Sequence, residues 1–154
     1  MSGYRIVEDD LTGAEVVALI RLHLADMAAI SPEESCHALP LEQLKSPDVT
    51  FWSAWDGERL AACGALKQLD AAHGEIKSMR AAPEYRGKAA GRAILDHLLA
   101  EARRRSYSRL SLETGSTDDF LPARSLYAAN GFVVCGPFAD YVFDPWSTYM
   151  TLEL

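Results

Sequence analysis

Two glycines and three cationic side chains fall within one short segment, Arg86–Arg92 (RGKAAGR). A stretch typical of a strand, Glu75–Ala81, comes before the segment, and a pattern typical of a helix follows it. Because Gly87 and Gly91 have no side chains, backbone N–H groups there can approach a ligand closely. The first N–H groups of a helix lack internal partners, and the helix macrodipole favours an anion beside them. The segment therefore predicts a phosphate site; the alternative is a tight turn with solvated cations.

The three cations narrow the expected ligand. Arg86, Lys88 and Arg92 surround the glycines, and an arginine can pair with a phosphate through two parallel hydrogen bonds. The segment lacks the GxxxxGK[ST] spacing of a P-loop and the GxGxxG spacing of a dinucleotide fold. The sequence therefore predicts a pyrophosphate held by a loop of another kind.

Turn residues and caps indicate the elements that position this segment. The dipeptide Asp56-Gly57 separates two strand-like stretches and predicts a β-hairpin. Thr12, with a glutamate three residues later, is a capping-box pattern that predicts the start of a helix, and Ser31-Pro32 predicts a second helix start. Asn130-Gly131 predicts the end of a helix near residues 123–129.

Periodicity gives the order of the elements. Strands are expected at residues 4–7, 49–56, 59–70, 75–81, 109–114, 132–135 and 148–154, with a long helix after the glycine-bearing segment. An antiparallel meander followed by a strand–helix–strand unit predicts an α/β (mixed α+β) fold with helices on both faces of a sheet. The 154 residues, of which 49% are hydrophobic and 24% charged, suit one globular domain over residues 1–154.

Charge and composition argue against several classes of protein. A net charge of -7 disfavours a nucleic-acid partner and weakly favours a cationic one such as an amine. The cysteines Cys36, Cys63 and Cys135 show neither disulfide nor zinc spacing, and the histidines show no metal spacing. No apolar run approaches the roughly 18 residues that span a bilayer, and the first residues do not read as a signal peptide. We expect a cytoplasmic protein with no metal and no membrane partner.

Two motifs resemble those of the GNAT superfamily of N-acetyltransferases. PEYRGKAAGRAIL resembles the superfamily's R/Q-x-x-G-x-G/A loop, and SLYAANGF resembles the LYxxxGF element that follows its fourth helix. The departures are Glu84, where Gln or Arg is common, and Ala89, where Gly is most frequent. The resemblance covers nearly the whole chain and implies a central, mostly antiparallel sheet of six to seven strands with helices on both faces. It also implies that acetyl-CoA is the co-substrate and that its pyrophosphate lies on Arg86, Gly87, Lys88, Ala89, Ala90, Gly91 and Arg92.

The same resemblance implies roles for four further residues. Glu75 corresponds to a glutamate that acts as a base in histone-acetylating members; the alternative is an ordinary surface carboxylate at a strand end. Tyr127 corresponds to a tyrosine aimed at the CoA sulfur; the alternative is a tyrosine packed in the core. The backbone groups of Met79 and Ala81 are expected to contact the acetyl carbonyl and the pantetheine arm, unless they only pair strands.

The resemblance predicts an N-acetyltransferase that transfers the acetyl group directly, in a ternary complex, to the primary amine of a small molecule. A protein lysine or N-terminus remains an alternative acceptor, and a non-catalytic acyl-CoA-binding or regulatory module is an alternative function. A homodimer is possible. The adjacent Cys36 and His37 could form a nucleophile pair, but adjacent residues seldom face each other, so we expect no covalent intermediate on the enzyme.

Overall fold

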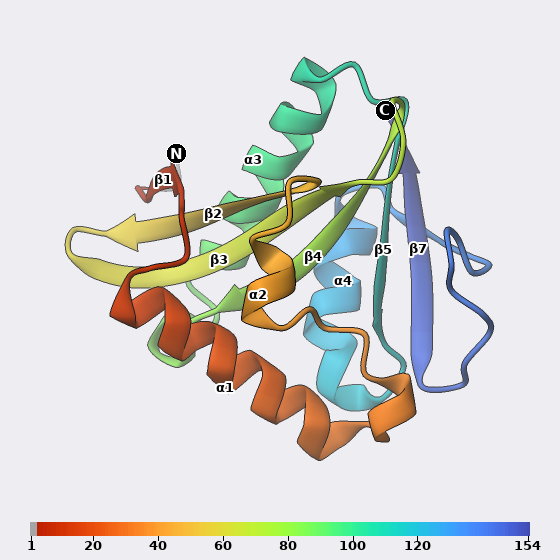
Figure 1. Ribbon diagram of the computed structural model, residues 1–154, viewed down its shortest axis with the longest axis horizontal. Helices are drawn as coiled ribbons and strands as arrows, with labels where there is room; N and C mark the ends of the chain where they lie inside the picture. Colours follow the sequence, from red (N-terminus) through yellow and green to blue (C-terminus); the bar gives the residue numbers. More distant parts are fainter. Residues whose placement is uncertain (1–2) are drawn as a thin grey trace.

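The computed structural model describes residues 3–154 and contains a seven-stranded sheet with strand order β1-β2-β3-β4-β5-β7-β6 (Figure 1). All neighbouring strands are antiparallel except β4 and β5, which are parallel. The expected fold, a mostly antiparallel sheet within a mixed α/β architecture, is confirmed. The strands are β1 (Arg5–Glu8), β2 (Val49–Asp56), β3 (Arg59–Gln68), β4 (His73–Ala81), β5 (Arg109–Gly115), β6 (Val133–Cys135) and β7 (Ser147–Glu153).

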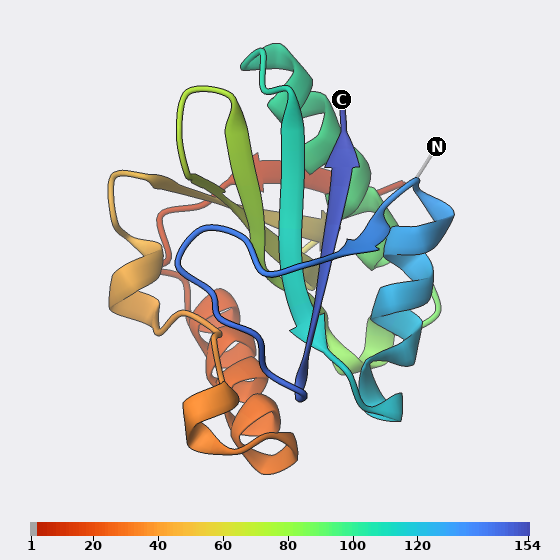
Figure 2. The same ribbon diagram turned by 90° about the vertical axis from the view of Figure 1, so that its right-hand side faces the viewer.

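Helices cover both faces of the sheet (Figures 1 and 2). Helix α1 (Ala14–Ile30) lies on one face, together with the short helix α2 (Leu41–Leu44). Helices α3 (Ala90–Arg104) and α4 (Leu121–Ala129) lie on the opposite face. Three single 3₁₀ turns complete the set: η1 (Glu33–Ser35), η2 (Pro83–Tyr85) and η3 (Asp118–Phe120). Among the described residues, none of the helices combines the length and the apolar character that crossing a membrane requires.

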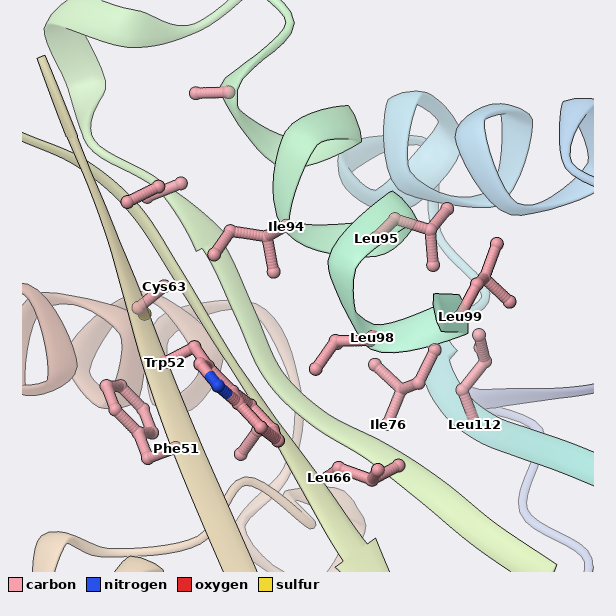
Figure 3. Close-up of a cluster of buried hydrophobic side chains, with 14 of the residues drawn as sticks. Phe51, Trp52, Cys63, Leu66, Ile76, Ile94, Leu95, Leu98, Leu99 and Leu112 are labelled. Atoms are coloured by element: carbon pink, nitrogen blue, oxygen red, sulfur yellow. The ribbon is translucent and has the colours of Figure 1, made fainter. Parts of the chain in front are cut away.

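The main core lies between α3 and the sheet (Figure 3). Ile94, Leu95 and Leu98 project from α3 toward Ile76 of β4 and Leu112 of β5, and all five are at most 3% exposed. Their spacing matches the apolar stripe that the sequence predicts for this helix. Burying a side chain of this size stabilises the fold by about 1.5–3 kcal/mol, so α3 and the loop before it are firmly anchored on the sheet.

The expected hairpin and helix end are confirmed, but both expected helix starts are wrong in detail. Helix α1 begins after Gly13 without a side-chain cap, because the hydroxyl of Thr12 donates to the Asp10 carboxylate (2.6 Å) and is not available to the helix. The segment after Ser31-Pro32 forms only the 3₁₀ turn η1 and not a longer helix. Pro40 limits that region, since the residue before a proline is disfavoured in helical conformation.

The two parallel strands at the centre of the sheet pair over only part of their length. β4 pairs with β5 from His73 to Ile76, and no pairing joins them beyond that point. Ser78 then adopts a left-handed conformation (φ 54°), and the register between β3 and β4 shifts in the same region. Such irregularities bend a strand and end its pairing. The C-terminal half of β4 therefore leaves β5 and opens the sheet at its centre.

Candidate functional site

A cavity of about 840 Å³ occupies the place where β4 and β5 part. Its walls come from both faces of the sheet: α3 and α4 on one side, α1 and η1 on the other. Because the strands that would separate the two faces are unpaired there, the cavity passes through the sheet. Residues from the different sides include His23, Met27, Ser35 and His37 on the α1 face, Lys77–Ala81 and Leu112–Gly115 on the strands, and Ala90, Gly91, Leu126 and Tyr127 on the α3–α4 face.

The predicted anion-binding segment lies at one end of this cavity and presents free backbone donors. Gly87 and Ala89 both adopt left-handed conformations (φ 74° and 63°), and the first helical hydrogen bond of α3 runs from Ala93 N to Ala89 O. Within residues 3–154, the N–H groups of Gly87, Ala89 and the first three residues of α3 have no acceptor. Successive N–H groups in such a turn form a concave nest that suits a phosphate.

The space above this nest fits a large anion. A side chain added at Gly87 would meet no atom within 4 Å, and one added at Gly91 would meet only Leu126, at 3.7 Å. Packing within the protein therefore does not explain why Gly91 lacks a side chain. The cations Arg86 and Lys88 flank the nest, with Lys88 Nζ 5.6 Å from the centre of the Tyr85 ring. The residues present thus fit the pyrophosphate of a CoA molecule.

The strand edge left by β5 carries the two backbone groups expected to contact the acyl chain. The N–H of Ala82 donates to Ala61 O across β3 (2.8 Å). Because N–H directions alternate along a regular strand, the amide of Ala81 is turned to the opposite side, toward the space that β5 has left. Met79 follows directly after the bulge at Ser78, where this alternation is interrupted, and it lines the same space. That space is the cavity.

Tyr127 reaches the same cavity from α4. Its side chain is 5% exposed and lines the wall, while its ring packs edge-on against Phe132. The hydroxyl makes no hydrogen bond with any residue in 3–154, although buried tyrosines usually have a partner. Burial raises the pKa of Tyr127, so the group stays protonated and able to donate.

Glu75 lies beneath the cavity and not on its wall. The carboxylate is 2% exposed and accepts a hydrogen bond from Tyr141 Oη (2.6 Å) and another from Lys77 Nζ (3.3 Å). Lys77 Nζ also donates to Tyr141 Oη (2.9 Å) and to His37 O (3.2 Å). The carboxylate is therefore enclosed by a hydrogen-bonded network that joins β4 to the loop between β6 and β7.

A second carboxylate, which the sequence analysis did not single out, does line the cavity. Glu113 of β5 follows Leu112, the last residue of that strand that pairs with β4, and it remains paired with Tyr149 of β7. Burial raises the pKa of Glu113, and the Ser147 side chain and the nearby charge of Lys77 oppose the rise in part. The available signal was its position at the end of an alternating strand, one residue beyond buried Leu112.

The adjacent cysteine and histidine do not form a nucleophile pair. The Cys36 thiol is directed at the backbone carbonyls of Met27 and Ser31 (both 3.5 Å), and burial raises its pKa. A thiol whose pKa is raised carries little of the reactive thiolate. No cluster of three or more potential metal ligands occurs within the described part of the chain.

Comparison with known proteins gives a family match. The model of the acetyltransferase (GNAT) family matches residues 15–132. The chain is 56% identical to the uncharacterised N-acetyltransferase YsnE of Bacillus subtilis over 95% of its own length and 97% of the relative's. It is 49% identical to the uncharacterised N-acetyltransferase YedL of Escherichia coli, over 98% of the chain and 95% of the relative.

Solved structures of related folds agree with this match. A protein from Klebsiella pneumoniae assigned as an acyl-CoA N-acyltransferase superposes with a TM-score of 0.80 at 30% identity, covering 100% of this chain and 99% of the other. A GNAT family acetyltransferase from Elizabethkingia anophelis, solved with acetyl-CoA bound, gives a TM-score of 0.74 at 17% identity and covers all of both chains. The second likeness concerns the fold alone.

Proposed function

The chain belongs to the GNAT family of acetyltransferases, and on that premise we propose that it transfers an acetyl group directly from acetyl-CoA to the primary amine of a small molecule. The observation that carries the proposal is the cavity through the sheet. One substrate can enter from the α3–α4 face and the other from the α1 face, so both meet between β4 and β5. This arrangement supports direct transfer within a ternary complex, without a covalent acyl-enzyme intermediate.

Acetyl-CoA supplies the acetyl group as a thioester. The nest at Gly87–Arg92 holds the pyrophosphate, and the left-handed turn that builds the nest also aims its N–H groups. The amides of Met79 and Ala81 bind the pantetheine arm and the thioester carbonyl along the free edge of β4. A backbone N–H aimed at that carbonyl stabilises the negative charge that develops on its oxygen.

We assign the removal of the amine proton to Glu113. It is a half-buried carboxylate on the cavity wall, and its raised pKa brings it closer to the range in which a base works at neutral pH. Glu113 takes one proton from the ammonium group and passes it on to solvent. The neutral amine then forms the C–N bond as the C–S bond breaks, and the second proton that its nitrogen loses balances the one that the departing thiolate gains. Glu75, enclosed by Lys77 and Tyr141, acts as a positioning residue that fixes this wall.

Tyr127 acts on the sulfur. Its unpaired hydroxyl, held on the cavity wall by α4, donates to the departing thiolate and so lowers the energy of the leaving group. Tyr127→Phe removes this donor while keeping the ring that packs on Phe132. We expect its kcat to fall by about 10²- to 10⁴-fold with an unchanged fold, since a positioned proton donor contributes a factor of that order.

The experiment that tests the proposal measures release of free CoA from acetyl-CoA with a panel of small primary amines. Initial rates at varied concentrations of both substrates are expected to give intersecting double-reciprocal lines, the pattern of a ternary complex. Parallel lines would show an acyl-enzyme and overturn direct transfer. Turnover of protein lysines or N-termini alone would overturn the small-molecule acceptor. Tight acetyl-CoA binding without turnover of any amine would identify a binding module.

The two glutamates are distinguished by their pH profiles. Glu75→Gln is expected to lower kcat while retaining the acidic limb of the kcat/KM profile, because Glu113 still titrates. If Glu75→Gln removes that limb and Glu113→Gln leaves it in place, Glu75 is the base and the assignment is reversed.

A further inference from the structure

One cation on the α1 side of the cavity is buried but only partly bonded. Arg80 of β4 has a side chain that is 11% exposed, and it forms an ion pair with Asp26 of α1 through one terminal nitrogen. That pair is its only side-chain bond within residues 3–154, and its Nε is buried without an acceptor. A guanidinium has five N–H donors, and buried donors are normally paired. Arg80 therefore has several donors without acceptors beside an open cavity.

Other unpaired groups line the same cavity. Ser78 Oγ, His23 Nδ1 and His37 Nε2 are all buried and have no hydrogen-bond partner among the described residues. Ser78 and His23 are each 9% exposed. A hydroxyl can donate, and a neutral imidazole donates through one of its two nitrogens. These residues therefore add unpaired polar atoms to the wall of the cavity that Arg80 also lines.

The other charged groups in the cavity narrow the choice of ligand. The three donors of Lys77 are taken by Glu75, Tyr141 and His37, and its charge is paired with Glu75, so it has no donor left for a ligand. Asp26 already offsets part of the charge on Arg80, and its own side chain is 39% exposed. What remains is one edge of a planar guanidinium, which matches a single planar carboxylate through two parallel hydrogen bonds. A doubly charged phosphate would lack a second free cation here.

We propose that the acetyl acceptor is a primary amine that also carries a carboxylate, of the amino-acid class, and that Arg80 binds that carboxylate. The inference rests on the proposed function. Arg80 lies on β4 and Glu113 on β5, so the two charges border the cavity from the two strands that part around it. The acceptor's carboxylate pairs with Arg80 while its amine faces Glu113, and this fixes the nitrogen at the thioester.

The test compares matched acceptors that differ only in the carboxylate. The panel consists of the amino acids that occur in proteins, β-alanine and γ-aminobutyrate, each as the free compound. Each is assayed beside its carboxamide, with release of CoA as the readout. We expect at least one amino acid to exceed its amide in kcat/KM by about 100-fold or more, because a site built to pair a polar group rejects the analogue that lacks it. Equal rates for acids and amides would overturn the inference.

Arg80→Lys supplies the matched variant. It keeps the positive charge and the partner for Asp26 but loses the planar fork, so the fold is expected to survive. For the preferred amino acid, kcat/KM should fall by about 100-fold, while the amide changes by less than about 3-fold and the KM for acetyl-CoA stays constant. An equal loss for acid and amide would overturn the role of Arg80.

The outcomes also separate this inference from the proposed function. Turnover of amides or simple amines without any preference for a carboxylate would remove the inference and leave an amine acetyltransferase. If neither acids, amides nor simple amines are acetylated, both statements fail.

Discussion

Ala89 shows how a single residue can favour a binding loop at a cost to the fold. It is the residue before α3, and its left-handed backbone (φ 63°) turns the loop so that free N–H groups point outward. A residue with a side chain pays about 1–2 kcal/mol for this conformation, whereas glycine adopts it readily. The frequent glycine at this position of the family's loop therefore has a conformational reason.

Ala89→Gly is accordingly expected to stabilise the protein. Part of the gain is lost to the greater freedom of glycine in the unfolded chain, which leaves about 0.5–1 kcal/mol, or roughly 1–4 °C in Tm. The matched control is Ala100→Gly, the same change at an exposed position inside α3, which should cost about 1 kcal/mol. Thermal unfolding of both variants measures the signs, and a lower Tm for Ala89→Gly would contradict the argument.

Glu113 makes a second prediction at the level of one residue. If its carboxylate accepts the amine proton, kcat/KM falls when the group is protonated, and burial places that fall at a higher pH than an ordinary glutamate would. Glu113→Gln should lower kcat/KM by about 10²- to 10⁴-fold near neutral pH and abolish the acidic limb. Glu42→Gln, which removes an exposed charge on α2, serves as the control and should leave the profile unchanged. An intact limb in Glu113→Gln would rule out this role.

Among the elements, α1 carries a buried titratable group against the open half of β4. His23 is 9% exposed, and burial, with a further contribution from Arg80, lowers its pKa to about 4. In the unfolded chain the group takes up a proton near pH 6.5, so below that pH the unfolded state binds more protons than the folded state. Stability is therefore complete above pH 6.5 and is lost progressively as the pH falls toward 4.

This gives a pH dependence that can be measured on folding alone. Between pH 7 and pH 5, His23 should account for a loss of about 2 kcal/mol in the free energy of unfolding. In His23→Gln the same pH change should cost about 2 kcal/mol less, even if the variant is less stable at pH 7. Urea unfolding at the two pH values provides the comparison. An equal loss in both proteins would show that His23 does not titrate as its burial requires.

The elements also explain which parts of the site could be predicted from sequence. The strand at residues 75–81, the glycine-bearing loop and the helix after it follow from apolar spacing and turn chemistry, which are local. The separation of β4 from β5 accompanies the left-handed conformation of Ser78, and no local sequence pattern predicts that conformation. The burial of Glu75 depends on Tyr141, which lies 66 residues away in a loop without periodicity. Local sequence patterns therefore could not predict that Glu75 lies beneath the cavity, nor that Glu113 lines it.

For the whole molecule, binding of acetyl-CoA to the folded state alone should raise its thermal stability. At a ligand concentration of 100 Kd the gain is about 2.7 kcal/mol, which for a chain of this length corresponds to roughly 5–10 °C.

Gly87→Glu places a carboxylate in the open space above the nest, where it meets no protein atom but repels the pyrophosphate. The ligand-induced shift, measured from each variant's own Tm, should therefore disappear. Gly57→Glu is the matched control, because Gly57 is also left-handed (φ 59°) and a side chain there also meets no atom within 4 Å, so this variant carries the same backbone strain and should keep the shift. A shift that persists in Gly87→Glu would place the pyrophosphate elsewhere, and no shift in the unaltered protein would remove acetyl-CoA as its ligand.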